Sequence, residues 1–455
     1  MSTDMTGIYQ SSLFSTLEVV TTHVSPGSKY RVLAECLPWP QLAEVANKYR
    51  SMKINIHNGA KLDLRCHLGA YIAQAMNGWT DRATEDMVRH HAGVRILCAI
   101  ESSDKSIDHT SIETFRNMVG PDGAEELNLI IVQYATGAGF TGSNLCSSDT
   151  TVQEAPIAYP TEVGHLKKIM EELTGIGKKC LPVTKSPLNT MAKIAKDLFT
   201  EIRLFTKGKK EKAIEKKKKL SKKLHQTVKK IFAHVATGVS KLSKKSRELY
   251  QEEMDLYKKM ISQIKVWLET GFHPKEKIIS LWNQTARAIS RGKDAKETEF
   301  GRRWSITRLL NGYILGRPCE KLGSDSDGHI AEEVITQFLE VFGEVPEKFI
   351  YDRGGDGSHN HEFLSNLGIQ NCIFLKGKIK MQVIHKKDFS LIKKERALSE
   401  AAIATLKTPR YNFTRPRAKT EISCITKGHK AILGANLTKI ATDLGNVFGM
   451  SQVMG

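Results

Sequence analysis

The sequence contains no long apolar run. No stretch of its 455 residues approaches the roughly 18 consecutive apolar residues of a membrane-spanning helix. The N-terminus also lacks the basic and then apolar layout of a secretory signal. The eight cysteines include no CxxC pair, the spacing typical of zinc sites and dithiol redox centres. We therefore expect a soluble cytoplasmic protein with reduced thiols and no membrane partner.

Acidic residues are in deficit. The 49 Asp and Glu face 68 Lys and Arg, which leaves a formal charge of +19. Such a surplus favours a polyanionic partner, because binding releases that partner's counterions. Nucleic acid is the first candidate. The length suits roughly two to four domains, and the composition is that of an ordinary globular protein.

The first 140 residues carry helical patterns. The expected helices are Trp39–Tyr49, Lys61–Met76, Thr80–His91, Ser111–Met118 and Ala124–Thr136. Gly78 separates the second from the third, and Thr80 is a suitable N-cap. Lys61–His91 therefore fits a helix-turn-helix, in which Arg82, Arg89 and the two following histidines would face phosphates. A plain helical bundle with a solvated face fits the pattern about as well.

Helical periodicity also runs through residues 161–270, which contain the densest charge of the chain. Within the segment 207–230, the lysines expected to contact the DNA backbone are Lys216, Lys217, Lys218, Lys219, Lys222 and Lys223. Apolar residues recur beside them at helical steps: Ile214, Leu220, Leu224, Val228, Ile231, Val235, Val239 and Leu242. An amphipathic helix coated with lysine is expected, and a merely solvated face is the alternative. The last helix carries a packed seam at Tyr250, Met254, Tyr257, Ile261, Ile264 and Leu268.

The remaining segments alternate between strands and helices. Asn311-Gly312 between two extended runs is a strong hairpin signal. The expected order, with the helical block removed, is strand Leu145–Val152, hairpin Arg303–Leu310 and Tyr313–Arg317, helix His329–Phe342, strand Lys348–Asp352, helix Glu362–Leu367, strand Gln370–Leu375 and helix Lys393–Lys407. This order is that of a ribonuclease H-like fold with a mixed five-stranded sheet and a large helical insertion after the first strand. The fold class is thus α/β, or α+β overall.

Four parts follow from this order. Residues 1–140 would form a helical N-terminal domain for DNA binding or oligomerisation. Residues 141–160 and 299–410 would form the catalytic domain, and residues 161–298 the basic helical insertion. Residues 411–455 would be a C-terminal helical extension that packs on the catalytic domain.

Three acids fall on elements that converge in this topology. Asp149 lies on the first strand, Asp352 at the end of the fourth, and Glu400 on the last helix. Hard divalent cations prefer oxygen ligands, and carboxylates from distant segments repel one another without them. Two magnesium ions on these acids would serve phosphodiester chemistry. Taken singly, each acid also fits a turn, a loop cap or a strand end.

The helix of Glu400 adds two cations. Arg396 precedes the acid by four residues and Lys407 follows it by seven, so all three share one face. An exposed salt-bridge ladder and a metal ligand between two phosphate contacts both fit this stripe.

These motifs resemble those of the DDE transposases of bacterial insertion sequences. The similar segments are Ser-Ser-Asp149-Thr-Thr-Val, Tyr-Asp352-Arg-Gly-Gly-Asp and Arg396-(three residues)-Glu400-(six residues)-Lys407. Further similar positions are Trp79, Thr80, Asp81, Arg82, Asp108, His109, Thr110, Phe115, Arg116, Tyr159, Pro160, Thr161, Gly292, Lys293, Glu299, Phe300 and Gly301. Lys393 stands where a Tyr is common, and Gly355 and Gly357 replace a Tyr and a Ser.

The resemblance implies a transposase that binds the terminal inverted repeats of its element, cleaves the DNA and joins the 3′-hydroxyl ends to target DNA. Asp149, Asp352 and Glu400 would hold Mg²⁺, with Mn²⁺ able to substitute. Arg396, Lys407 and Arg353 would contact double-stranded DNA. The active form would be a homodimer or larger assembly, associated with the nucleoid when bound to DNA. The alternative function is a non-catalytic DNA-binding protein derived from a transposase.

Two shorter motifs are similar to a nuclease motif and to a phosphate-binding loop, but each lacks features that the motif requires. His359-Asn360-His361 spells HNH, but that nuclease motif needs its residues dispersed over a hairpin and a helix. The segment from Gly175 to Lys178 lacks the earlier glycine and the Ser or Thr of a phosphate-binding loop.

Overall fold

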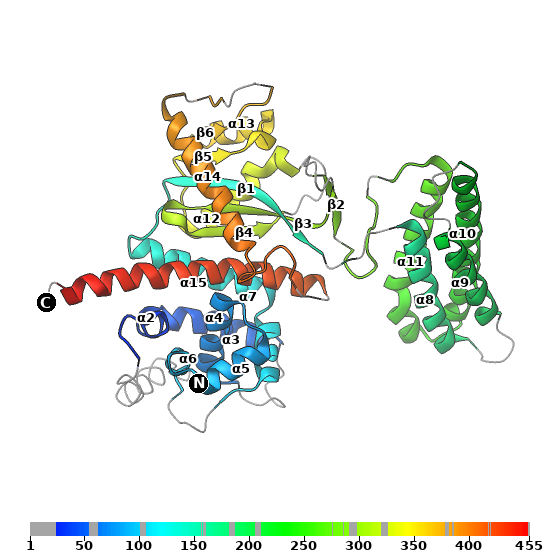
Figure 1. Ribbon diagram of the computed structural model, residues 1–455, viewed down its shortest axis with the longest axis horizontal. Helices are drawn as coiled ribbons and strands as arrows, with labels where there is room; N and C mark the ends of the chain where they lie inside the picture. The colour runs from blue at the N-terminus through cyan, green and yellow to red at the C-terminus, as the bar shows by residue number, and fades with distance from the viewer. Residues whose placement is uncertain are drawn as a thin grey trace. The chain divides into compact units, whose positions relative to one another are not determined.

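The structure is a computed structural model (Figure 1). It describes residues 24–53, 62–100, 106–155, 157, 161–181, 187–204, 211–274, 276–284, 286–290, 298–319, 326–377, 382–384, 386–416, 418 and 420–453. The chain divides into two compact units, one made of residues 1–156 with 289–455 and the other of residues 157–288. The finer division into four parts stays a prediction.

The first unit begins with a cluster of helices, as expected. They are α2 (Lys29–Cys36), α3 (Trp39–Lys53), α4 (Leu64–Asn77), α5 (Asp81–His90), α6 (Ala92–Leu97) and α7 (His109–Gly137). Gly78 ends α4 in the left-handed conformation, and the Thr80 hydroxyl caps α5. The two helices predicted on either side of residues 119–123 are joined in α7, which bends at Gly120 and Pro121.

The sheet of this unit has six strands, so the expected number of five was wrong. The strands are β1 (Leu145–Glu154), β2 (Arg287–Ser290), β3 (Thr298–Arg308), β4 (Ile314–Pro318), β5 (Lys348–Tyr351) and β6 (Gln370–Ile373). Their order is β2-β3-β1-β5-β6, with β4 paired to β3. The unexpected strand is β2, which lies next to β3 at the end of the strand order. The mixed sheet otherwise has the ribonuclease H-like arrangement that the sequence predicted.

The hairpin and the mixed character of the sheet agree with prediction. Asn311 and Gly312 both have positive φ and connect β3 to β4, which pair antiparallel. β1 pairs antiparallel with β3 and parallel with β5, and β5 pairs parallel with β6. The helices that follow are α12 (Ile330–Phe342), α13 (Ser358–Asn366) and α14 (Phe389–Leu406).

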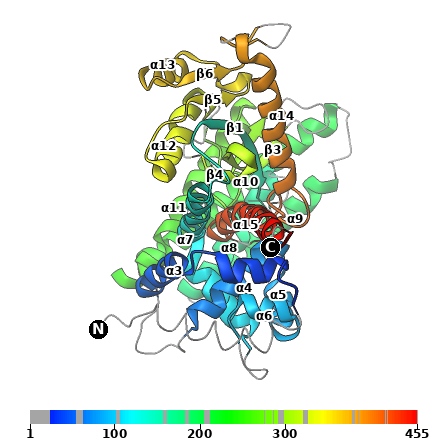
Figure 2. The ribbon, with the colours of Figure 1, turned by 90° about the vertical axis from the view of Figure 1, so that its left-hand side faces the viewer.

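The two faces of the sheet are covered by different helices. Phe349 and Tyr351 of β5 lie in the same core cluster as residues of α12, whereas Ile350 between them packs with Ile392 of α14. This alternation is the period of two of a strand buried on both faces. Figures 1 and 2 show α14 running along the sheet. Asp149 and Asp352 lie on the face that α14 covers.

The C-terminal helix α15 (Glu421–Val453) joins the sheet to the N-terminal helices. Its Leu433 and Leu437 belong to the core of α2–α7, and its Ile432 packs against β3 and β4. The buried amide of Asn436 bonds to Asn128 of α7 and to the backbone of Ile314 in β4. The expected C-terminal helix therefore runs through the middle of the first unit (Figure 1).

The second unit is helical, as predicted. It contains α8 (Glu162–Cys180), α9 (Leu188–Leu204), α10 (Glu211–Ser240) and α11 (Lys244–Thr270). Every expected seam residue of α11 is buried or packed against the core of this unit. The expected apolar stripe of α10 is buried from Leu220 to Val239, but Ile214 is 56% exposed. Ile214 lies in the first turn of α10, ahead of the residues that meet the core.

All eight cysteines lie in described segments and are free thiols, as expected. Among the described helices, none combines the length and apolarity needed to cross a membrane.

Candidate active site

Asp149 and Asp352 lie at the same level of two neighbouring strands. Ser147 of β1 is the register partner of Ile350 of β5 in a parallel pair. Asp149 follows Ser147 by two residues, and Asp352 follows Ile350 by two. Because side chains alternate along a strand and adjacent strands are about 4.8 Å apart, both acids start from the α14 face of the sheet. The first two members of the predicted triad therefore come together.

Helix α14 brings Glu400 to the same face. The Ser399 hydroxyl donates to Ser147 Oγ at 2.7 Å, which seats α14 on β1 two residues before Asp149. Glu395, one turn earlier, forms an ion pair with Arg308 of β3. Glu400 follows Ser399 directly and pairs with Arg396 across 3.1 Å. The structure thus places all three predicted acids around the end of the β1–β5 pair.

The electrostatics of the two aspartates reflect this crowding. Burial, followed by the negative charges of Asp352 and Glu400, raises the pKa of Asp149 to about 6, although Thr150 N–H and Arg396 oppose the shift. Burial is also the main cause that raises the pKa of Asp352, followed among the raising causes by Asp327 and Glu400. Ionising both aspartates together therefore costs free energy that a nearby cation would offset.

The donor set suits a hard divalent cation. Asp149 and Asp352 are partly buried carboxylates that each accept one backbone N–H, from Thr150 and Gly354 respectively. Each carboxylate has further acceptor positions, since two oxygens offer about four lone-pair sites. Oxygen ligands from carboxylates are those that Mg²⁺ and Mn²⁺ prefer. The residues present therefore fit the expected metal.

A fourth acid, Asp327, was missed by the sequence reasoning. It lies in the short helix η3 (Ser326–His329), accepts bonds from Arg303 at 2.8 Å and from the Tyr351 hydroxyl at 3.2 Å, and raises the pKa of Asp352. A Cβ built on Gly354 would stand 2.7 Å from the Asp327 carboxylate and 2.9 Å from that of Asp352. Its position just before a predicted helix is the signal that the sequence offered, and that position is equally typical of a cap.

The cations predicted to contact DNA occupy three places. Arg396 of α14 sits between Glu400 and the Phe374 ring, and Lys407 is the C-cap residue that follows α14. Arg353 opens the turn η4 (Arg353–Gly355) directly after Asp352. The six predicted lysines lie on α10 in the other unit, where Lys217 is half-buried and the other five are exposed.

The candidate helix-turn-helix forms two consecutive helices, α4 and α5. The exposed side of α5 carries two ion pairs within the helix, Arg89 with Glu85 at 3.0 Å and His90 with Asp86 at 3.7 Å. His91 caps the next helix through its ring nitrogen. Such pairs are typical of a solvated helix face. A plain helical bundle with such a face was the alternative interpretation of this segment.

A basic groove in the first unit was also missed. Its volume is about 910 Å³, and it lies between the α4–α5 turn, the segment after α14 and the start of α15. The charged residues that line it are Asp81, Glu113, Arg116, Arg410, Arg415, Lys427 and Lys430, with the aromatic rings of Trp79 and Tyr411 beside them. Five cations against two acids leave a net positive charge. The sequence offered no signal for the groove, because its lining comes from segments more than 300 residues apart.

Lys430 shows how concentrated this positive charge is. Its ammonium bonds to Gln74 and lies over the Tyr71 ring. Burial, followed by the nearby charge of Arg116, lowers the pKa of Lys430 to about 7. An anion in the groove would favour the protonated form.

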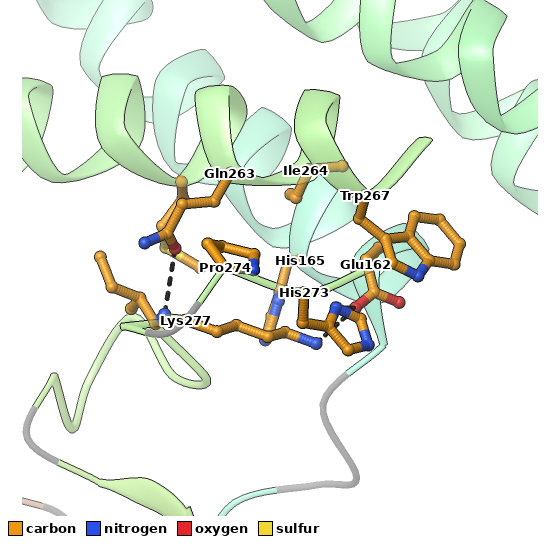
Figure 3. A pocket seen from close by; sticks show the side chains of 10 residues that line it. Glu162, His165, Gln263, Ile264, Trp267, His273, Pro274 and Lys277 are labelled. Carbon is orange, nitrogen blue, oxygen red and sulfur yellow. Dashed lines mark hydrogen bonds and ion pairs between the residues drawn. The ribbon is translucent and has the colours of Figure 1, made fainter. Parts of the chain in front are cut away.

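The helical unit contains a small hollow next to α8 and α11 (Figure 3). Its volume of about 10 Å³ holds no more than a water molecule. Glu162 pairs there with His273 and Lys277, and Gln263 bonds to the backbone of Ile278. The polar groups of this hollow are thus engaged with one another, and we assign it no role.

One comparison with known proteins gives a match. Residues 18–118 match the family model described as a transposase domain (DUF772). No curated protein and no solved structure matches the chain. The matched segment contains α2 to α6 and the first part of α7. The match supports the insertion-sequence resemblance over the N-terminal helices.

Some residues of the resemblance cannot be placed. Tyr159, Pro160, Gly292 and Lys293 lie outside the described residues.

Proposed function

We propose that this chain is a DDE transposase that binds the terminal inverted repeats of a mobile element. It cleaves the DNA by phosphodiester hydrolysis and joins the 3′-hydroxyl ends to target DNA. One observation carries the proposal: the β1–β5 register and the seating of α14 gather Asp149, Asp352 and Glu400 in a chain that has a transposase domain.

The three acids would hold Mg²⁺, and Mn²⁺ would substitute for it. When bound, such ions activate an attacking oxygen and compensate the charge of the phosphoryl group. Arg396 holds the Glu400 carboxylate at 3.1 Å and offers its remaining N–H groups to a phosphate. Arg353 directly follows Asp352, and Lys407 follows the last residue of α14; both supply further phosphate contacts.

The DNA path would include the basic groove. Arg415 of the groove pairs with Glu154 at 2.8 Å, and Glu154 is the last residue of β1, five residues after Asp149. At about 3.3 Å per residue, the two positions on β1 are about 17 Å apart. Roughly five base pairs of duplex cover that distance, at ~3.4 Å per pair. A DNA segment that contacted both the groove and the acids would have to cover at least this distance.

The α10 lysines would bind a further stretch of DNA backbone. Because a mobile element has two ends, the active complex would contain a homodimer or a larger assembly. We place the protein in the cytoplasm, on the nucleoid when it is bound to DNA.

Cleavage of DNA that carries the inverted repeats flanking this gene tests the proposal. With Mg²⁺ or Mn²⁺, the protein should nick the element ends and join them to a target plasmid, and EDTA should abolish both reactions. Tight binding of the ends without cleavage under any metal condition would instead support the alternative, a DNA-binding protein derived from a transposase.

A further inference from the structure

A second group of metal-binding side chains lies outside the carboxylate cluster. His329 ends η3, Glu332 lies in the first turn of α12, and His359 is the second residue of α13. Their candidate ligand atoms all lie within 4.8 Å of one another. We propose that these three residues bind a transition-metal ion of the Zn²⁺ class.

The separations suit a single ion. Glu332 Oε2 is 3.4 Å from His359 Nε2 and 3.8 Å from His329 Nδ1. Ligand atoms bonded to tetrahedral zinc at about 2.0–2.1 Å stand about 3.3 Å apart, so small rotations would complete the site. Two imidazoles and one carboxylate form a ligand set that zinc accepts with a fourth position open. The exposed fractions of the three side chains, 38%, 47% and 46%, leave room for a water there.

An unsatisfied ligand atom is an independent sign of a missing partner. Among the described residues, His329 Nδ1 is buried and has no hydrogen-bond partner. At 3.8 Å, the Glu332 oxygen is too far away to accept a hydrogen bond from it. The His329 and His359 rings lie with their centroids 4.0 Å apart, so both rings approach the same small volume. A metal ion in that volume would satisfy the buried nitrogen.

Asn360 connects the backbone segments around the site through hydrogen bonds. This residue is fully buried between the two helices. Its amide donates to the carbonyls of Asp327 at 2.7 Å and Gly355 at 2.8 Å, and its oxygen accepts from the Ala331 N–H at 3.2 Å. The starts of α12 and α13 are thereby fixed to each other next to all three ligands. In the HNH triplet of the sequence, the first histidine is a proposed ligand and the asparagine positions it.

The ligand type separates this site from the carboxylate cluster. Imidazole nitrogen favours transition metals, whereas an all-oxygen set favours Mg²⁺ and Mn²⁺. The two sites are nevertheless linked through the chain, because Asn360 bonds to Gly355 in the turn that follows Asp352. We expect the bound ion to stabilise this turn and to leave the choice of the catalytic metal unchanged.

Titration of the metal-free full-length protein with Co²⁺, followed by visible absorption, tests the site. Wild type should bind one Co²⁺ with the intense bands of a tetrahedral nitrogen-containing site, and Zn²⁺ should displace it. His359→Gln and Glu332→Gln should each weaken binding at least about tenfold. His90→Gln is the matched control, since His90 forms an exposed pair with Asp86 on α5 and should leave binding unchanged.

A second pair of variants separates this proposal from the proposed function. The double variant Asp149→Asn/Asp352→Asn should keep the Co²⁺ bands and the rise in melting temperature caused by Zn²⁺. Circular dichroism checks that every variant is folded. The proposal is wrong if wild type binds Co²⁺ no more tightly than His359→Gln, or if the double variant loses the bands while Glu332→Gln keeps them.

Discussion

At the scale of single residues, ionisation of the carboxylate cluster is unfavourable in the folded chain. Asp149 is partly buried on β1, and its pKa is raised to about 6 by burial and by the charges of Asp352 and Glu400. Perturbed pKa values cluster at functional sites, and structural ion-pair networks shift them as well. The hydrophobic cores of the protein offset this unfavourable electrostatic free energy.

The raised pKa of Asp149 predicts that the free energy of unfolding depends on pH. The folded pKa of about 6 exceeds the ordinary value of 3.8. The destabilisation is therefore absent below pH 3.8, grows between pH 3.8 and 6, and is complete above pH 6. In metal-free protein at pH 8, Asp149→Asn should raise the free energy of unfolding by on the order of 2 kcal/mol, measured with urea. At pH 4 most of this gain should disappear.

The matched control for this change is Asp86→Asn, which removes an exposed acid of α5. It should alter stability by less than about 0.5 kcal/mol at either pH. Adding Mg²⁺ should reduce the difference in free energy of unfolding between wild type and Asp149→Asn, because the ion binds the ionised cluster. A gap that does not change with pH would contradict the electrostatic account.

At the scale of elements, α10 combines a buried stripe with an exposed lysine face. Leu224 is fully buried against the neighbouring helices of its unit, whereas Ile214 in the first turn is 56% exposed. Leu224→Ala should lower the free energy of unfolding by about 3 kcal/mol, because it opens a cavity in the core. Ile214→Ala is the control and should cost less than about 0.5 kcal/mol in the same urea experiment. Equal losses would show that the helix packs differently.

The lysine face predicts a salt-dependent contribution to DNA binding. Lys222 and Lys223 are exposed on α10. Changing both to Gln should weaken binding to duplex DNA and reduce the slope of log K against log salt by about 1.8, or about 0.9 for each phosphate contact. Lys258 and Lys259, exposed on α11, provide the matched control pair. If both double variants reduce the slope of log K against log salt by the same amount, α10 has no special contact with DNA.

The elements of the sheet were predictable because their signals are local. A period of two, an Asn-Gly turn and the order of strands and helices were enough to place Asp149 on the first strand and Asp352 at the end of the fourth. β2 was not predicted from the sequence. Ile214 was placed in the core because periodicity shows which residues share a face but not where along a helix its packing partners begin.

At the scale of the whole molecule, the features that escaped prediction depend on contacts between distant segments. Arg116 and Arg410 line one groove although almost 300 residues separate them. Asp327 reaches Asp352 through the fold of η3, and α15 lies between the sheet and the N-terminal helices. Sequence periodicity identifies α15 as a helix but does not specify its neighbours.

The groove gives a prediction at this scale. Arg116→Ala/Lys427→Ala should weaken binding of the element ends several-fold, because two cations of the groove are lost. Lys167→Ala/Lys265→Ala removes two lysines that form exposed i,i+4 pairs in the helical unit and is the control. Electrophoretic mobility shift at two salt concentrations measures both variants. Unchanged binding in the groove variant would place the DNA elsewhere.

The central claim is that Asp149, Asp352 and Glu400 form the site that cleaves DNA. The most direct test is the initial rate of strand cleavage at an element end in Mg²⁺, compared between Asp352→Asn and Asp356→Asn. Asp356 lies four residues after Asp352 but pairs with His361 and Lys376 instead of facing the cluster. The account predicts that Asp352→Asn abolishes cleavage while Asp356→Asn retains it; full activity in folded Asp352→Asn would contradict the account.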